Sequence, residues 1–165
     1  MNPMLLLVKK LSYDVEDQIF SEVSLAIEKP ETYYEKFKDE KGIDSSWMDA
    51  LEWIALIEAL LDHELAFDLD WKVRGVYLCD VVDELLERKN MTFMDWDDFE
   101  DVEFDKLTTT QCLNAISEKL KEHQISLASL DTGEDRYYLI TVQSSDIDEI
   151  KELAQEAGYT ILDSF

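Results

Sequence analysis

The chain has 165 residues, of which 15 are lysine or arginine and 39 are aspartate or glutamate, so its formal net charge at pH 7 is −24. This acidic excess argues against a nucleic-acid-binding protein, which needs clustered Lys and Arg to neutralise phosphates, and against binding to an anionic membrane surface. Apolar residues make up 46% of the chain, which supplies enough material for a hydrophobic core and excludes the composition of a disordered protein.

Apolar residues that recur at helical spacing predict three helices in the first 64 residues. The first covers about residues 12–28, and the second, shorter helix starts at Pro30 and is closed by Gly42. A serine cap opens the third helix, which ends near Glu64. Because this third helix is apolar on most sides, we expect it to lie in the centre of the fold.

After Glu64 the apolar period changes from that of a helix to that of a strand. Strands are predicted at residues 66–71, 125–130, 136–143 and 159–162, and the turn between the middle two makes a hairpin. Helices are predicted at about residues 76–89, 108–124 and 144–157. We therefore expect a single domain, residues 1–165, of the α+β or mixed α/β class, with about five or six helices packed on a small sheet of about four strands.

Apolar positions of these elements supply the predicted core, which includes Trp47, Leu51, Ile54, Leu61, Leu69, Val82, Leu113, Ile116, Leu139, Ile150 and Leu153. The two cysteines, Cys79 and Cys112, fall among apolar neighbours in predicted helices, which favours buried core thiols over a disulfide or a metal site. The apolar run at residues 4–8 is followed by two lysines, whereas a secretory signal places its positive charge first. No apolar stretch reaches the length of a membrane span, so we expect a cytoplasmic protein.

Two short segments carry a resemblance to a known family. Residues 68–72 read DLDWK and residues 130–137 read LDTGEDRY, and a predicted helix ending at Gly158 and a final strand follow them. In these features the chain resembles a small, acidic bacterial family of unknown function, a resemblance that implies no catalytic or binding residue. In size and composition the chain is also similar to bacterial toxin-immunity proteins, which implies a role in binding and inhibiting a toxin.

The residue patterns of common catalytic and cofactor sites are missing from the sequence. The four glycines match neither a dinucleotide-binding nor a P-loop spacing, and His63 and His123 have no His or Cys at metal-ligand spacing. Both histidines fall near predicted helix C-termini, where a cation is favourable. An EF-hand loop starting at Asp95 would need glycine at its sixth position, which is Glu100. We therefore predict no enzyme, no cofactor and no metal site.

Residues 91–105, here called the acidic-aromatic segment, contain seven acidic residues, four aromatic residues and no basic residue. Like charges this close repel one another, and aromatic side chains concentrate at protein interfaces. The predicted partner-binding residues are Asp95, Trp96, Asp97, Asp98, Phe99, Glu100, Asp101, Glu103 and Asp105. An alternative interpretation is that the aromatic rings only hold the segment to the core while the acids face water.

The charge and this segment together favour a non-catalytic protein that binds a basic protein, with a toxin as the first class to consider. One alternative is a DNA mimic, whose carboxylates take the place of phosphates in a nucleic-acid-binding site. The other is a bacterial protein of unknown function whose acidic surface is only solvated. The sequence leaves the partner and the oligomeric state open.

Overall fold

The structure, a computed structural model, describes residues 1–73, 75–99 and 102–165. Its centre is a four-stranded antiparallel sheet in the order β1-β3-β2-β4. The strands are β1 (Phe67–Asp70), β2 (Ile125–Leu130), β3 (Arg136–Gln143) and β4 (Ile161–Leu162). Together with eight α-helices among the described residues, this sheet confirms the predicted α+β class.

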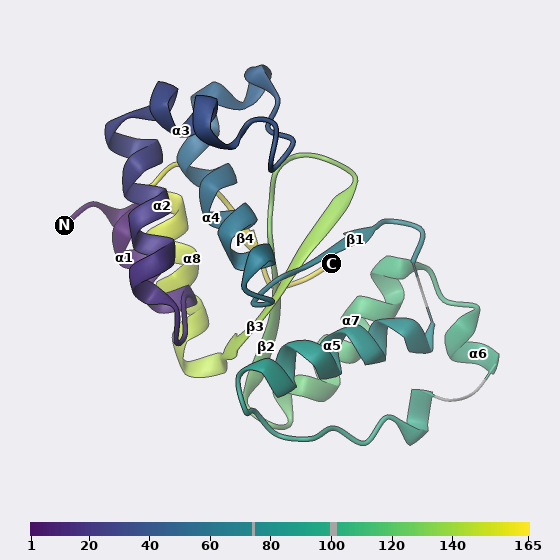
Figure 1. Cartoon of the computed structure of the whole chain (residues 1–165). Helices are drawn as coiled ribbons and strands as arrows, with labels where there is room; N and C mark the ends of the chain where they lie inside the picture. Colours follow the sequence, from purple (N-terminus) through teal and green to yellow (C-terminus); the bar gives the residue numbers. More distant parts are fainter. Residues whose placement is uncertain (74, 100–101) are drawn as a thin grey trace.

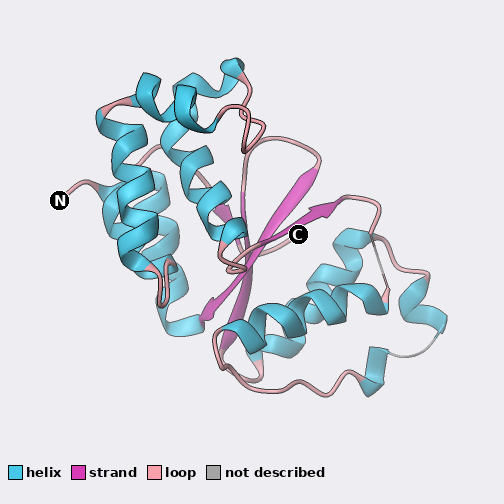
Figure 2. Cartoon of the chain, in the orientation of Figure 1, coloured by secondary structure: helices cyan, strands magenta, loops and turns pink. Residues whose placement is uncertain are grey.

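Helices cover both faces of the sheet (Figure 1 and Figure 2). One layer contains α1 (Pro3–Leu11), α2 (Glu16–Glu28), α3 (Pro30–Phe37), α4 (Leu51–Asp62) and α8 (Ile147–Glu156). The other contains α5 (Val76–Arg88) and α7 (Thr109–Lys121). The short helix α6 (Val102–Asp105) and the 3-10 turns η1 (Ser45–Ala50), η2 (Asp97–Phe99) and η3 (Ser144–Asp146) lie in the connections.

Strand β2 shows why the sheet can carry a helix layer on each face. All six of its residues are buried, and successive side chains point to opposite faces. Ile125 and Leu127 enter the hydrophobic cluster under α5 and α7, whereas Ala128 and Leu130 enter the cluster under the N-terminal helices and α8. The two clusters are therefore built on one shared sheet.

Helix ends are fixed by local signals in the sequence. Thr108 and Gln111 form a reciprocal capping box that starts α7. Asn2 accepts a hydrogen bond from the Met4 N–H at 2.7 Å, and Pro3 occupies the first position of α1. At the end of α8, Gly158 takes a positive φ of 95°, and the Tyr159 N–H donates to the Ala154 carbonyl.

The structure adds elements that the periodicity did not predict. Residues 3–11 form α1, and residues 102–105 form α6. Of the predicted core, Trp47 and Leu61 are only partly buried, because Trp47 lies in the η1 turn and Leu61 lies at the end of α4 beside a surface groove. The other nine predicted core residues are buried. The single-domain organisation stays a prediction. None of the described helices is long and apolar enough to cross a lipid bilayer.

Candidate binding surface

The acidic-aromatic segment connects α5 to α7 and is held against both helices by its rings. Trp96 and Phe99 stack with centroids 5.7 Å apart, and Phe99 stacks on the buried Phe104 at 4.7 Å. The Trp96 indole N–H donates to Asp83 Oδ1 of α5 at 2.8 Å. From α7, Lys119 Nζ lies 5.3 Å from the Phe99 ring centre. Trp96 and Phe99 therefore serve the packing of the segment itself, as the alternative interpretation described.

The carboxylates of the segment face the opposite way. Asp95, Asp97, Asp98, Glu103 and Asp105 are all exposed. Two of these carboxylates have a lysine partner, since Lys119 lies 3.1 Å from Asp98 and Lys106 lies 3.2 Å from Glu103. The predicted positions Glu100 and Asp101 lie outside the described residues. The segment thus presents an acidic surface above an apolar underside.

Asp105 also explains the glycine that precedes α5. A Cβ added at Gly75 would lie 2.5 Å from Asp105 Oδ1, and Gly75 has a φ of +80°. Any other residue would be strained there and would displace the carboxylate. Gly75 therefore allows the end of the segment to approach the start of α5.

Phe93 is the aromatic residue of the segment that does not pack inward. Its side chain is 93% exposed. It borders a hollow of about 400 Å³ lined by Asp83, Leu86, Glu87, Asn90, Met91, Thr92, Phe93 and Met94. Phe93 was not among the predicted partner-binding residues, although it lies in the same segment of acidic and aromatic residues as they do. Exposed aromatic rings are enriched at protein interfaces.

Helix α5, which packs against the segment, carries a row of carboxylates, of which Asp80, Glu84 and Glu87 are exposed and Asp83 is partly buried. Asp80, Asp83, Glu84 and Glu87 follow one another at spacings of three, one and three residues, which places them on one side of the helix. Acids at these spacings repel one another and weaken an isolated helix. We call these four residues the α5 acidic row.

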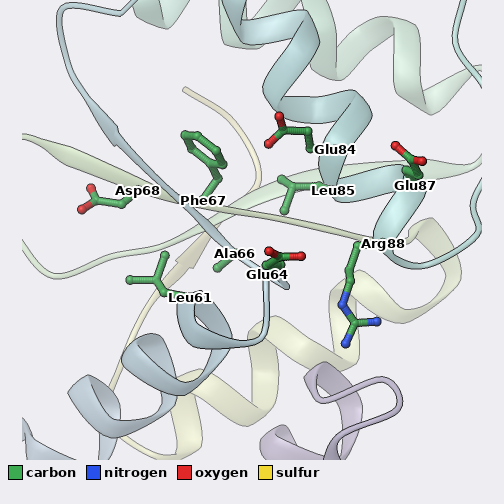
Figure 3. A pocket seen from close by; sticks show the side chains of 9 residues that line it. All are labelled: Leu61, Glu64, Ala66, Phe67, Asp68, Glu84, Leu85, Glu87 and Arg88. Carbon is green, nitrogen blue, oxygen red and sulfur yellow. The ribbon is translucent and has the colours of Figure 1, made fainter. Parts of the chain in front are cut away.

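A larger hollow, of about 620 Å³, lies on the other side of the α5 acidic row. It is lined by Leu61, Glu64, Ala66, Phe67, Asp68, Glu84, Leu85, Glu87 and Arg88 (Figure 3). Its walls come from the end of α4 and from α5, which cover opposite faces of the sheet. The two walls can meet only around the outer edge of β1, so we call this hollow the β1-edge groove. Glu87 lines both hollows.

Some charged side chains of the β1-edge groove have an ion-pair partner and others have none. The Arg88 guanidinium is held by Asp14 at 2.7 Å and by the His63 carbonyl at 2.9 Å. Asp68 is held by Arg136 at 2.6 Å. Glu64, Glu84 and Glu87 make no ion pair with any residue that the structure describes. The groove therefore combines an apolar floor with three carboxylates that have no ion-pair partner among the described residues.

The two cysteines lie in the hydrophobic cluster under α5 and α7. Cys79 and Cys112 are buried and form no disulfide, as predicted. Burial, and then the neighbouring Asp83, raises the pKa of the Cys79 thiol to about 12, which disfavours the reactive thiolate. Within residues 1–73, 75–99 and 102–165, no group of three or more His, Cys, Asp or Glu is placed to hold a metal ion.

Comparison with known proteins identifies the family. A family described as a domain of unknown function, DUF6630, matches residues 3–165, and the chain belongs to it. The match covers nearly the whole chain, more than the two segments from which the resemblance was drawn. No curated protein and no solved structure matches the chain.

Proposed function

We propose that this chain is a non-catalytic acidic protein that binds and neutralises a basic protein, with a toxin as the first class of partner to test. The observation that carries the proposal is the set of exposed carboxylates of the acidic-aromatic segment, which the Trp96–Asp83 hydrogen bond connects to the α5 acidic row. Four like charges on one side of a helix reduce its stability. A cationic partner would offset that repulsion and would be attracted at long range.

Apolar contact surface accompanies this charge. Phe93 is almost fully exposed next to the hollow beside α5, and Trp71 and Tyr77 are about half exposed near the start of α5. Interfaces that bind tightly combine a few aromatic anchors with a charged rim. The exposed Phe93 beside these carboxylates favours binding over a surface that is only solvated.

The first experiment is capture from the native cell, with the partner identified by mass spectrometry. We expect a basic protein whose capture decreases when Asp97, Asp98, Glu100 and Asp101 are changed to Lys. The matched control changes Glu31, Glu35, Asp39 and Glu40, which lie on and after α3, to Lys and so has the same net charge. Capture of no basic protein, or equal loss in both variants, would contradict the proposal.

The second measurement is the association rate with the captured protein as a function of salt. The Debye length decreases from about 10 Å at 0.1 M to about 3 Å at 1 M, so an association steered by charge slows steeply. The dissociation rate should change less. A captured DNA-binding protein that duplex DNA displaces from this chain would instead support the DNA-mimic alternative.

A further inference from the structure

The outer edge of β1 is open inside the β1-edge groove. Strand β1 pairs with β3 on one side, and no described strand pairs with it on the other. At such an edge, every second residue directs its N–H and C=O away from the sheet. Ala66, Phe67 and Asp68 line the groove, so this backbone borders the hollow directly.

The walls of the groove suit a strand laid beside β1. Side chains of an added strand would alternate above and below the sheet. On one side they would meet Glu84, Leu85 and Glu87 of α5, and on the other Leu61 and Glu64 at the end of α4 (Figure 3). Each wall therefore offers both a carboxylate and an apolar side chain.

Glu64, one of the wall residues, lies between α4 and β1. Its φ is +60°, a conformation that glycine adopts freely and glutamate adopts at a cost. It is the residue that ends α4, since the Leu65 N–H donates to the Leu60 carbonyl at 2.8 Å. Tyr13, Asn90 and Gln124 have a similar positive φ shortly after α1, α5 and α7, so this is a recurrent way of ending helices in the chain.

We propose that the β1-edge groove binds an extended segment rich in lysine or arginine, which pairs with β1 as a fifth strand of the sheet. The proposal rests on the proposed function, because the segment would belong to the basic partner. Backbone hydrogen bonds to β1 would supply affinity, and the carboxylates of Glu64, Glu84 and Glu87 would select cationic side chains.

The observations favour this occupant over a second copy of the chain. Two copies joined at β1 would bring together two sets of the same three carboxylates, which have no ion-pair partner among the described residues, on molecules that each carry a net charge of −24. Acidic residues on an edge strand also discourage such pairing. A cationic strand would instead be attracted both by the carboxylates of the groove and by the acidic residues of β1.

The test uses the full chain and a peptide of seven residues that alternates lysine with valine. Binding is followed by NMR of backbone amides, and we expect shifts at residues 66–70 and 84–88 rather than at 95–105. Two further peptides have the same charge but are N-methylated at either the odd or the even residues. Only one of the two sets of peptide N–H groups faces β1 and donates to it. The peptide methylated at that set should bind at least about tenfold more weakly than the unmodified peptide, and the other methylated peptide should bind about as tightly as the unmodified one.

A matched pair of variants tests whether the carboxylates of Glu84 and Glu87 contribute to peptide binding. Glu84→Lys with Glu87→Lys should weaken binding of the unmodified peptide, whereas Glu31→Lys with Glu35→Lys, which changes the net charge equally, should have little effect. Equal binding of the two methylated peptides, no binding of the unmodified peptide, or equal effects of the two variants would overturn the groove assignment.

The captured partner separates this inference from the proposed function. If the Glu84 and Glu87 variant captures the basic protein as well as the wild type does, while the variant at residues 97–101 does not, the groove assignment is wrong and the proposed function stands. If no basic protein is captured but the peptide pairs with β1, the groove assignment stands and the proposed partner is wrong.

Discussion

Glu64 ends α4 in a backbone conformation that suits glycine, as Gly158 does at the end of α8. Corresponding hydrogen bonds close both helices: the Glu64 N–H donates to the Leu61 carbonyl, and the Gly158 N–H donates to the Gln155 carbonyl. We predict that Glu64→Gly raises the free energy of unfolding by about 1 kcal/mol, because it removes the cost of a side chain at positive φ. Urea unfolding measures this change.

The reciprocal substitution is the control for this prediction. Gly158→Glu should lower the free energy of unfolding by a similar amount, since a Cβ at Gly158 meets no atom within 4 Å and only the backbone strain is added. A destabilised Glu64→Gly variant would show that the carboxylate itself supports the fold.

Lys89 is a second residue whose environment is unusual. Its Nζ donates to the Thr141 carbonyl at 2.7 Å. Burial, and then the charge of Arg88, lowers the pKa of the Lys89 ammonium from 10.5 to about 8. We predict an NMR titration of the Lys89 side chain with a midpoint near that value, and a midpoint above pH 10 would contradict it.

The direction of the stability change follows from this shift in pKa. Between pH 8 and 10.5 the unfolded chain binds more protons at Lys89 than the folded chain does, so the free energy of unfolding contributed by Lys89 increases over that range. The Lys89→Met variant should lack this increase. Denaturant unfolding of both proteins at several pH values makes the comparison.

At the scale of elements, the acidic-aromatic segment depends on its inward-facing rings. Trp96→Ala removes both the stack with Phe99 and the hydrogen bond to Asp83. We predict a loss of about 2 kcal/mol in the free energy of unfolding, because a partly buried ring and one hydrogen bond are lost. Phe93→Ala is the control and should have no effect on stability, since the Phe93 ring is 93% exposed. Equal effects of the two substitutions would contradict this description of the segment.

Sequence periodicity predicted the central hairpin of the sheet but not the first helix. Strands β2 and β3 have the bounds predicted, because β-branched and alternating residues flank a turn that contains Gly133. Helix α1 was not predicted, although Asn2 and Pro3 mark its start and its buried residues Met4, Leu7, Val8 and Leu11 have helical spacing. Its run of apolar residues, with few polar positions, hid that spacing.

The candidate surface was predicted only in part. The acids of the segment are exposed as expected where they are described, but the rings of Trp96 and Phe99 turn inward because α5 and α7 offer Asp83 and Lys119 as partners. The β1-edge groove could not be predicted. It depends on the strand order that leaves β1 at the edge and brings the ends of α4 and α5 together around it.

At the scale of the whole molecule, charge repulsion opposes folding. The 15 basic side chains are too few to pair with 39 acidic ones. We predict that the Tm increases as NaCl is raised from about 0.02 M to about 0.5 M, because screening weakens repulsion between carboxylates. The variant with Lys at positions 31, 35, 39 and 40 should show a smaller increase. A Tm that is independent of salt would contradict the prediction.

The packing of α8 among the N-terminal helices has a consequence for synthesis of the chain. Ile150 and Ala154 of α8 lie in the same buried cluster as Leu7 and Val8 of α1, and Lys10 pairs with Glu149 at 2.9 Å. A ribosome releases α1 first and must add some 140 further residues, which takes on the order of ten seconds, before α8 can cover it. During that interval the apolar faces of the first helices are exposed to chaperones and to other nascent chains, so the rate of translation through the middle of the message sets how long that exposure lasts.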